Sequence, residues 1–295
     1  MEDRMIERRS FLKLAVAAAA GPRILAATLD SKEAPGPKKP RKALLTNMLP
    51  KDVSDGERFR LAKDCGFDGI ETGPMADHKA AGERAKIARE EGVPIHSVLY
   101  GWWPPFTDRD PGTVGKSIEE MQNALRCAQV MGADAVLLVP TRVTEDFAYQ
   151  DAYKWSQEYV RRLIPTAEQT RVYVAIENVW NKFLLSPCEF ARYLDELGSP
   201  WIRAYFDVGN VIVHGYAQDW IRTLGKRIVK LHLKDFKRQG YQWTNLLDGD
   251  VNWPQVRKAM GEIGYDGWMT AELEGGDKAY LTDVAKRIDR IVAMA

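Results

Sequence analysis

Eight short apolar or β-branched runs alternate with amphipathic stretches from residue 42 onward, and this alternation limits the fold of the 295-residue chain more than any other feature. Runs of this kind are typical of buried strands, and strands separated by helices pair in parallel through right-handed crossovers. Eight such units in roughly 250 residues predict a closed (β/α)8 TIM barrel. An open, doubly wound sheet is the main alternative, but the GxGxxG turn that usually marks it is missing. The runs are Ala43–Met48, Asp68–Thr72, Pro94–Leu99, Ala135–Val139, Val172–Glu177, Ile202–Asp207, Ile228–Leu233 and Trp268–Leu273.

The stretches between the runs carry helix signals. Their apolar residues recur with helical spacing, and a glycine follows several of them, where a left-handed residue ends a helix. No sign of a second domain interrupts the pattern, so we expect residues 42–295 to form a single domain. The clearest helical stretches are Thr113–Met131, Ala152–Gln169, Pro187–Leu197, Trp253–Ile263 and Lys278–Met294, and the glycines are Gly66, Gly92, Gly132, Gly198 and Gly264.

The first 41 residues are typical of an export signal followed by a linker. The run Arg8-Arg9-Ser10-Phe11-Leu12-Lys13 resembles the twin-arginine export signal. The apolar stretch Leu14–Gly21 is too short to cross a bilayer, which takes roughly 20 residues. We therefore expect a removable signal peptide at 1–27, a flexible linker at 28–41, and export to the periplasm or beyond without stable membrane insertion. A basic amphipathic N-terminal helix is the alternative.

The charge balance argues against a nucleic-acid partner. Lys and Arg total 42 and Asp and Glu total 41, so no global field draws the chain to nucleic acid or to acidic lipid. The three cysteines are scattered and form neither a disulfide framework nor a CxxC metal motif. The sequence thus predicts no nucleic-acid partner and no dependence on oxidative folding.

Four successive strand ends carry side chains that can bind a metal ion: Glu177, Asp207, His232 and Glu272. Their separations are 207−177=30, 232−207=25 and 272−232=40, near the roughly 30 residues of one βα unit, with the Lys237–Val251 loop lengthening the last. Each acid alone would more often cap a helix or form a salt bridge, and the His alone would be a core residue. Four on consecutive strands predict one shared cation, since buried charges need a partner. Oxygen-rich ligands with one His favour Mn²⁺, Mg²⁺ or Co²⁺, and Zn²⁺ is also compatible.

The runs around these ligands resemble a known family. They are Glu177-Asn178-Val179-Trp180-Asn181, Phe206-Asp207-Val208-Gly209-Asn210, Lys230-Leu231-His232-Leu233-Lys234-Asp235 and Gly264-Tyr265-Asp266-Gly267-Trp268. Together they resemble the sugar phosphate isomerase/epimerase group of the xylose isomerase-like superfamily, which includes tagatose 3-epimerase and, more distantly, endonuclease IV. The resemblance spans residues 42–295 and indicates the fold and the metal site better than the substrate. Members of the group often form dimers, so a homodimer is one expected assembly.

The resemblance implies a reaction as well. In the resembled epimerases the first and last metal-binding Glu also move the proton, which implies catalytic roles for Glu177 and Glu272, while Asp207 and His232 act as ligands only. A cation that holds adjacent hydroxyl and carbonyl oxygens acidifies the neighbouring C–H and stabilises the enediolate. We therefore expect isomerisation or epimerisation, and export favours a free sugar, a keto-sugar or a glycoside as the substrate.

The residues that contact the sugar differ from the family pattern. Arg238 lies six residues after His232 (238−232=6), where the resembled epimerases place a substrate-binding Arg. Asn210 stands where they have a substrate-contacting His, and Phe183 where they have a Glu. We expect Arg238 and Asn210 to face the sugar, and the departures argue against a plain ketose 3-epimerase. A surface position is the alternative for Arg238.

Three residues on the second and third units are further candidates for substrate binding. Glu71 ends the second strand, His96 lies on the third, and Trp103 follows the third in a loop. Aromatic rings at a barrel rim suit the apolar face of a sugar. Ion pairing for Glu71, core packing for His96 and capping of the barrel for Trp103 are the alternatives.

Other function classes remain open at this stage. A lyase that acts on 3-keto-glycosides would use the same first step and then expel the glycosidic oxygen. An endonuclease IV-like nuclease needs several histidines at its metal cluster, and this chain has only His78, His96, His214 and His232. A non-catalytic sugar-binding protein would not require both Glu177 and Glu272.

Overall fold

A computed structural model of the protein describes residues 39–102 and 106–294. The predicted signal peptide at 1–27, most of the predicted linker at 28–41, and Trp103 lie outside the described residues. No helix within the described ranges is long and apolar enough to cross a bilayer.

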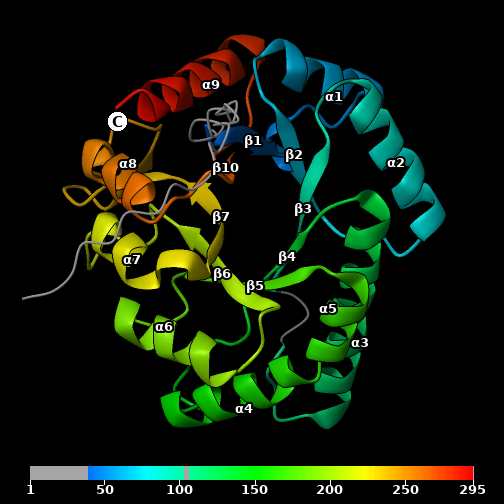
Figure 1. Ribbon diagram of the computed structural model, residues 1–295, viewed down its shortest axis with the longest axis vertical. Coiled ribbons are helices and arrows are strands. Elements are labelled where there is room, and N and C mark those ends of the chain that lie inside the picture. The colour runs from blue at the N-terminus through cyan, green and yellow to red at the C-terminus, as the bar shows by residue number, and fades with distance from the viewer. Residues whose placement is uncertain (1–38, 103–105, 295) are drawn as a thin grey trace, which may run out of the picture. The chain divides into compact units, whose positions relative to one another are not determined.

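Eight parallel strands form a closed barrel: β1 (Arg41–Leu45), β2 (Gly69–Thr72), β3 (Ile95–Gly101), β4 (Ala135–Leu138), β5 (Tyr173–Glu177), β6 (Ile202–Asp207), β7 (Ile228–Leu233) and β10 (Trp268–Ala271). Their order around the barrel is β1-β10-β7-β6-β5-β4-β3-β2, and the helices lie outside them (Figure 1). The predicted single-domain TIM barrel is therefore confirmed. The bounds predicted for β6 and β7 coincide with those observed, because a buried parallel strand is an unbroken apolar run with clear ends.

The helices are α1 (Asp55–Asp64), α2 (His78–Glu90), α3 (Pro111–Met131), α4 (Tyr149–Arg161), α5 (Ile164–Thr170), α6 (Pro187–Glu196), α7 (Ala217–Leu224), α8 (Trp253–Glu262) and α9 (Lys278–Val292), with short 3-10 turns η1 (Thr46–Met48) and η2 (Gly225–Arg227). The single helix predicted over Ala152–Gln169 is wrong. The chain breaks between α4 and α5 because Pro165 has no amide N–H and suits the first turn of a helix.

Apolar spacing decides which helix faces pack on the barrel. The last helix buries Leu281, Val284, Ala285, Ile288 and Ile291, which fall at i, i+3, i+4, i+7 and i+10. Its first turn is capped by the side chain of Asp277, which accepts the amide N–H of Tyr280. The five glycines predicted to end helices have φ values between 67° and 96°, so that prediction is confirmed.

The loop that follows β7 contains a hairpin that the sequence analysis did not predict. Strand β8 (Asp235–Lys237) pairs antiparallel with β9 (Gln242–Thr244). The buried carboxylate of Asp235 accepts the amide N–H groups of Phe236, Leu247 and Val251 and the Nε1–H of Trp253. One carboxylate thus fastens the whole loop to the end of β7.

Candidate metal centre at the rim of the barrel

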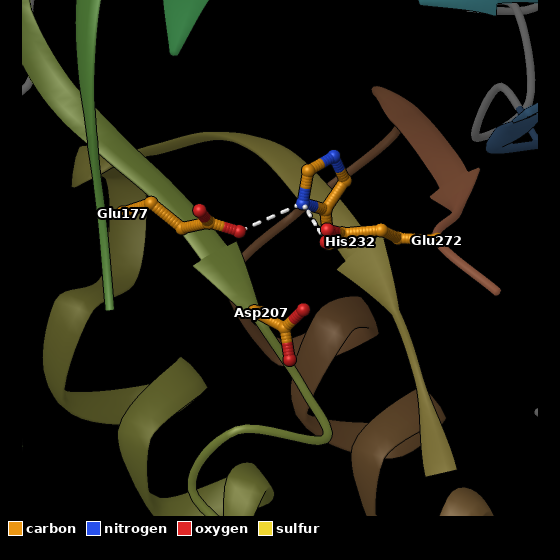
Figure 2. Close-up of side chains that lie close together, drawn as sticks. All are labelled: Glu177, Asp207, His232 and Glu272. Atoms are coloured by element: carbon orange, nitrogen blue, oxygen red, sulfur yellow. Dashed lines mark hydrogen bonds and ion pairs between the residues drawn. The ribbon is translucent and has the colours of Figure 1, made fainter. Parts of the chain in front are cut away.

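The structure brings all four predicted metal ligands to one rim of the barrel. The strand register places Asp207 level with His232, and Glu177 ends the strand that precedes β6. Glu272 directly follows β10, whose Thr270 is level with His232. One ligand atom from each of the four side chains lies within 4.8 Å of the others. Figure 2 shows the four side chains drawn together at the strand ends.

His232 is surrounded by carboxylates. Its Nδ1 lies 2.8 Å from Oε1 of Glu177 and 2.8 Å from Oε2 of Glu272, and these two glutamates reach it from different strands (Figure 2). Its Nε2 lies 3.2 and 3.3 Å from the two oxygens of Glu71. Nδ1 therefore faces two of the other predicted metal ligands, and Nε2 faces the barrel interior.

Lys234 lies between two of the carboxylates. Its Nζ is 2.9 Å from Oε2 of Glu272 and 3.4 Å from Oδ2 of Asp207. Both oxygens are buried, yet neither takes part in a hydrogen bond of good geometry among the described residues. An ion pair without good alignment satisfies a buried oxygen poorly, even at a short separation. Two buried oxygens that lack a directional hydrogen bond, together with a ring nitrogen of His232 within 4.8 Å, suit a divalent cation.

The electrostatics of the site follow from burial and from its own charges. Burial raises the pKa of Glu177 to about 7 and also raises the pKa of Asp207. Burial acts to raise the pKa of Glu272 as well, but His232 and Lys234 outweigh it and lower this pKa to about 2. Burial likewise opposes the charge on His232, but the surrounding carboxylates raise its pKa well above the usual value. Without a cation the imidazole thus carries a proton, which a bound cation would replace.

Glu71, predicted to bind the substrate, lies behind the imidazole. Its side chain is fully buried, and its carboxylate contacts Nε2 of His232 and accepts the hydroxyl of Tyr205. Tyr205 lies on β6, two residues before Asp207 and on the same face of the strand. Glu71 is therefore placed to orient His232 and has no exposed surface from which to touch a sugar.

Replacement of Glu71 by Gln is expected to weaken metal binding by about 10- to 100-fold, the usual effect of removing the hydrogen-bond partner of a metal-binding His. Gln keeps the size of the side chain but loses the charge that favours the Nε2–H form of His232. Titration calorimetry with Mn²⁺ would measure the change. Tyr205→Phe, which removes one bond to Glu71 and leaves the charge, should have a smaller effect. Equal affinities for Glu71→Gln and the wild type would contradict this role.

His96 packs inside the barrel. It is 4% exposed, its ring stacks on Trp268 with centroids 4.4 Å apart, and its Nε2 lies 3.1 Å from Oγ1 of Thr270. Burial lowers its pKa well below the usual value, so it is neutral. The structure thus gives His96 the packing position that was the alternative to substrate binding.

Asn210 braces the predicted metal ligand Asp207 from the loop after β6. Its amide N–H donates to Oδ1 of Asp207 at 2.7 Å, and its Nδ2 donates to the carbonyl of Asn178 at 2.9 Å. The side chain of Asn178 in turn bonds to both the N–H and the carbonyl of Asp207, each at 2.9 Å. Nε1 of Trp180 donates to the carbonyl of Asn210 at 2.8 Å. These bonds tie the ends of β5 and β6 together.

Arg238 is occupied by the loop after β6. Its Nε donates to the carbonyl of Ile212 at 2.8 Å, and one terminal nitrogen donates to the carbonyl of Gly215 at 3.3 Å. Its guanidinium also lies 5.6 Å from the ring centroid of Tyr216. This side chain therefore joins two loops and has fewer free donors for a sugar than the sequence suggested.

Lys234 is a residue of the site that was not predicted, although the sequence contains a signal for it. Residues 230 and 232 alternate along β7 and share one face of the strand, and residue 234, directly after β7, continues the alternation. Lys230 lies 2.5 Å from Asp134, while His232 and Lys234 lie among the carboxylates of the rim. The same alternation would have placed Tyr205 beside Asp207.

Comparison with known proteins gives a consistent result. A family model described as xylose isomerase-like TIM barrel matches residues 59–291. SgbU of Escherichia coli (strain K12), to which L-ribulose-5-phosphate 3-epimerase activity is provisionally assigned, is 31% identical over 76% of this chain and 85% of its own length. An L-ribulose 3-epimerase structure covers 86% of this chain and 94% of its own, with a TM-score of 0.73 and 14% identity. The structure of the 3-keto-D-glucoside 4-epimerase YcjR from E. coli covers 86% of this chain and 99% of its own, with a TM-score of 0.69 and 16% identity. The two structures show the shared fold.

Proposed function

This chain belongs to the xylose isomerase-like TIM barrel family, and from that premise we propose that it epimerises or isomerises a sugar by moving a proton next to a carbonyl group at the rim site. It is an enzyme of the isomerase/epimerase type, since the named relatives are sugar epimerases. The observation that carries the proposal is the approach of one ligand atom each from Glu177, Asp207, His232 and Glu272 to within 4.8 Å of one another.

The four side chains would hold one divalent cation, for which Mn²⁺, Mg²⁺ and Co²⁺ are the favoured candidates and Zn²⁺ is compatible. When bound, the cation supplies positive charge beside the sugar oxygens, which acidifies the neighbouring C–H. Asp207 and His232 act as ligands only, and each is held by its own partners, Asn178 and Glu71.

Glu177 and Glu272 would move the proton. They approach His232 Nδ1 from different strand ends (Figure 2), which suits removal of a proton from one face of a sugar by one carboxylate and its return to the other face by the second. Their environments differ, because the pKa of Glu177 is raised to about 7 and that of Glu272 is lowered to about 2. Glu177 thus keeps a proton at neutral pH more readily than Glu272, an asymmetry typical of an acid and base pair.

The rate of proton exchange should rise with pH as Glu177 loses its proton. Its raised pKa of about 7 means that the basic carboxylate form grows between pH 5 and 7 and is nearly complete above pH 8. A bound cation favours the carboxylate, so the midpoint for the loaded enzyme should lie at or below pH 7. Exchange of solvent deuterium into a ketose, followed by NMR from pH 4.5 to 8.5, measures the profile. A rate that falls from pH 5 to 7 is the opposite result.

Reconstitution with metal followed by deuterium exchange tests the function directly. The purified protein is stripped with a chelator, reloaded with Mn²⁺, Mg²⁺, Co²⁺ or Zn²⁺, and incubated in D₂O with keto-sugars and 3-keto-glycosides. We expect deuterium at the carbon next to the carbonyl only when metal is present, together with the epimer or isomer. Absence of exchange for every sugar and every metal would refute the proposal.

Elimination from a 3-keto-glycoside is the second candidate. The residues that contact the sugar in ketose 3-epimerases are replaced here, and Phe183 is 2% exposed within an aromatic cluster. After proton removal next to the 3-keto group, the C–O bond to the aglycone would break, a C=C bond would form, and the aglycone oxygen would take a proton. Release of aglycone in the same assay distinguishes this outcome from epimerisation.

Export through the twin-arginine route is a separate proposal, supported by Arg8-Arg9 and the short apolar stretch after them. Replacement of Arg8 and Arg9 by Lys in the full chain is expected to leave the protein in the cytoplasmic fraction, whereas the wild type moves to the periplasmic fraction. Fractionation and immunoblotting measure the distribution. Equal distributions would support the amphipathic-helix alternative.

A further inference from the structure

A cleft lies beside the rim site, between the loops that follow β4 and β5. Its volume is about 420 Å³, within the range of about 300–1,000 Å³ typical of small-molecule sites. We call it the 142–182 cleft, and its lining is Arg142, Val143, Thr144, Glu145, Asp146, Trp180, Asn181 and Lys182. None of these residues is among the four metal ligands.

The two loops that form the 142–182 cleft are fastened to each other. Asn181 is 2% exposed, and its Nδ2 donates to the carbonyl of Thr141 at 3.0 Å. The amide N–H of Val143 donates back to the carbonyl of Asn181 at 3.0 Å. The next part of the loop has non-glycine residues in the left-handed region, with φ of 58° at Lys182 and 55° at Leu184. Such conformations persist where the surroundings enforce them, and they gather at binding sites.

One wall of the cleft is the ring of Trp180, which is 39% exposed. The hairpin supports this ring, because Trp243 stacks on it with centroids 4.8 Å apart and an angle of 26°. Its Nε1–H is held by the carbonyl of Asn210. Trp180 therefore offers a rigid aromatic surface, and such surfaces bind the apolar faces of sugar rings at low entropic cost.

The positive and negative side chains of the cleft are equal in number. Arg142 and Lys182 are positive, Glu145 and Asp146 are negative, and none of the four forms a salt bridge with another described residue. Donors and acceptors around an aromatic wall suit a neutral ring with many hydroxyl groups. An anionic group such as a phosphate would meet the two carboxylates as well as the two cations.

The 142–182 cleft adjoins a second cavity at the end of β4. This second cavity of about 410 Å³ shares Arg142 and Thr144 with it and reaches Val139 at the end of β4. Val139 packs in the barrel interior in one cluster with Tyr205, whose ring centroid lies 4.3 Å from that of His232. The cleft and the predicted metal site thus lie at the same end of the barrel, where the loops after β4 and β5 leave the strands.

We infer that the 142–182 cleft is a subsite for a second, neutral sugar ring, so that the substrate is a ketose or keto-sugar joined to another sugar through a glycosidic bond. This inference rests on the proposed function for the position of the reacting ring. It names a substrate class that differs from the phosphorylated pentoses in the names of the relatives.

Four matched ketoses test the inference with the metal-loaded full chain. D-Fructose has a free 6-hydroxyl, isomaltulose carries a neutral glucosyl ring there, and D-fructose 6-phosphate carries an anion; maltulose places the same ring on the 4-hydroxyl. We expect kcat/KM for deuterium exchange to be at least about tenfold higher for isomaltulose or maltulose than for D-fructose, the effect of about 1.4 kcal/mol of added binding. A gain for the phosphate that exceeds the gain for both disaccharides, or no gain for any, would overturn the inference.

Variants test whether the cleft causes the higher kcat/KM for the disaccharides. Trp180→Ala should lower the ratio of kcat/KM for disaccharide over D-fructose by about tenfold, a size expected for aromatic stacking together with its buried area. Trp180→Phe loses the bond to Asn210 but keeps an aromatic face, so it should retain most of the ratio. Trp201→Ala, which removes a ring tilted against Tyr173 away from the cleft, is the matched control and should retain the ratio. A shift in oligomeric state for Trp180→Ala in sedimentation would assign the ring to contact with a second copy and overturn the inference.

A binding measurement that does not require turnover distinguishes the proposed reaction from the proposed sugar subsite in the 142–182 cleft. Saturation-transfer NMR with isomaltulose reports contact of the glucosyl ring with the protein, whether or not exchange occurs. Contact that disappears in Trp180→Ala, without exchange on any ketose, would support the cleft and refute the proposed reaction. Exchange on D-fructose without such contact would support the reaction and refute the cleft.

Discussion

Replacement of Glu177 by Gln is expected to lower kcat for proton exchange by about 10³-fold, in the middle of the range for loss of a general acid or base. The amide cannot accept the proton, although its carbonyl oxygen can still face the cation and the neighbouring Nδ1 of His232. Glu272→Gln should lose a similar factor, because each carboxylate would serve one face of the sugar. Both variants should still bind Mn²⁺ when it is supplied in excess.

The measurement is deuterium exchange at saturating metal, with metal content checked for each variant. Glu274→Gln is the matched control, since Glu274 lies two residues after Glu272 in an exposed position. We expect it to retain wild-type kcat. Retention of kcat in both Glu177→Gln and Glu272→Gln would rule out these carboxylates as the groups that move the proton.

Asp207→Asn is expected to have opposite effects on stability with and without metal. Burial raises the pKa of Asp207 above 3.8, so the stability associated with its protonated form is lost as pH rises through the folded-state pKa. At pH 7 the ionised carboxylate thus costs stability in the metal-free protein, and the neutral amide should raise the metal-free Tm by about 2–4 °C.

In the presence of metal, the wild type should have a higher Tm than Asp207→Asn. The free energy of unfolding of the wild type rises by about 2.7 kcal/mol when the free metal concentration is 100 times Kd. Asp207→Asn should bind the metal at least about 100-fold more weakly, because loss of only a hydrogen-bond partner of a ligand already lowers metal affinity by about 10- to 100-fold. Thermal unfolding with chelator and with Mn²⁺ measures both effects. Asp195→Asn, which breaks an exposed ion pair with Arg227, should not reverse the order. A Tm increase on Mn²⁺ addition as large in Asp207→Asn as in the wild type would remove Asp207 from the ligand set.

The sequence was sufficient for the barrel and for the position of the four ligands. Parallel strands are unbroken apolar runs, and a polar residue that ends such a run must lie at the same rim as its counterparts on neighbouring strands. That is why Glu177, Asp207 and His232 could be grouped from spacing alone. The loop hairpin β8–β9 escaped prediction because its strands have three residues each and depend on Asp235, whose partners are up to 18 residues away.

The direction of side chains beyond the rim was harder to predict. Glu71 ends an apolar run as Glu177 does, yet it lies behind His232 because β2 faces β6 and β7 across the barrel interior, where Tyr205 and Nε2 of His232 meet its carboxylate. Contacts across a barrel depend on strand stagger, which no local pattern contains. Arg238 matched the family spacing, but the carbonyl groups that occupy it belong to a loop whose conformation the spacing does not determine.

The bonds that run from Trp180 through Asn210 to Asp207 have a consequence for attempts to redesign this enzyme. A loop exchanged after β5 to accommodate a different sugar would replace the indole that holds Asn210, and would therefore also disturb Asp207, a proposed ligand of the cation. Libraries aimed at selectivity alone should lose metal retention as a side effect unless the indole nitrogen, or another donor in its place, is kept.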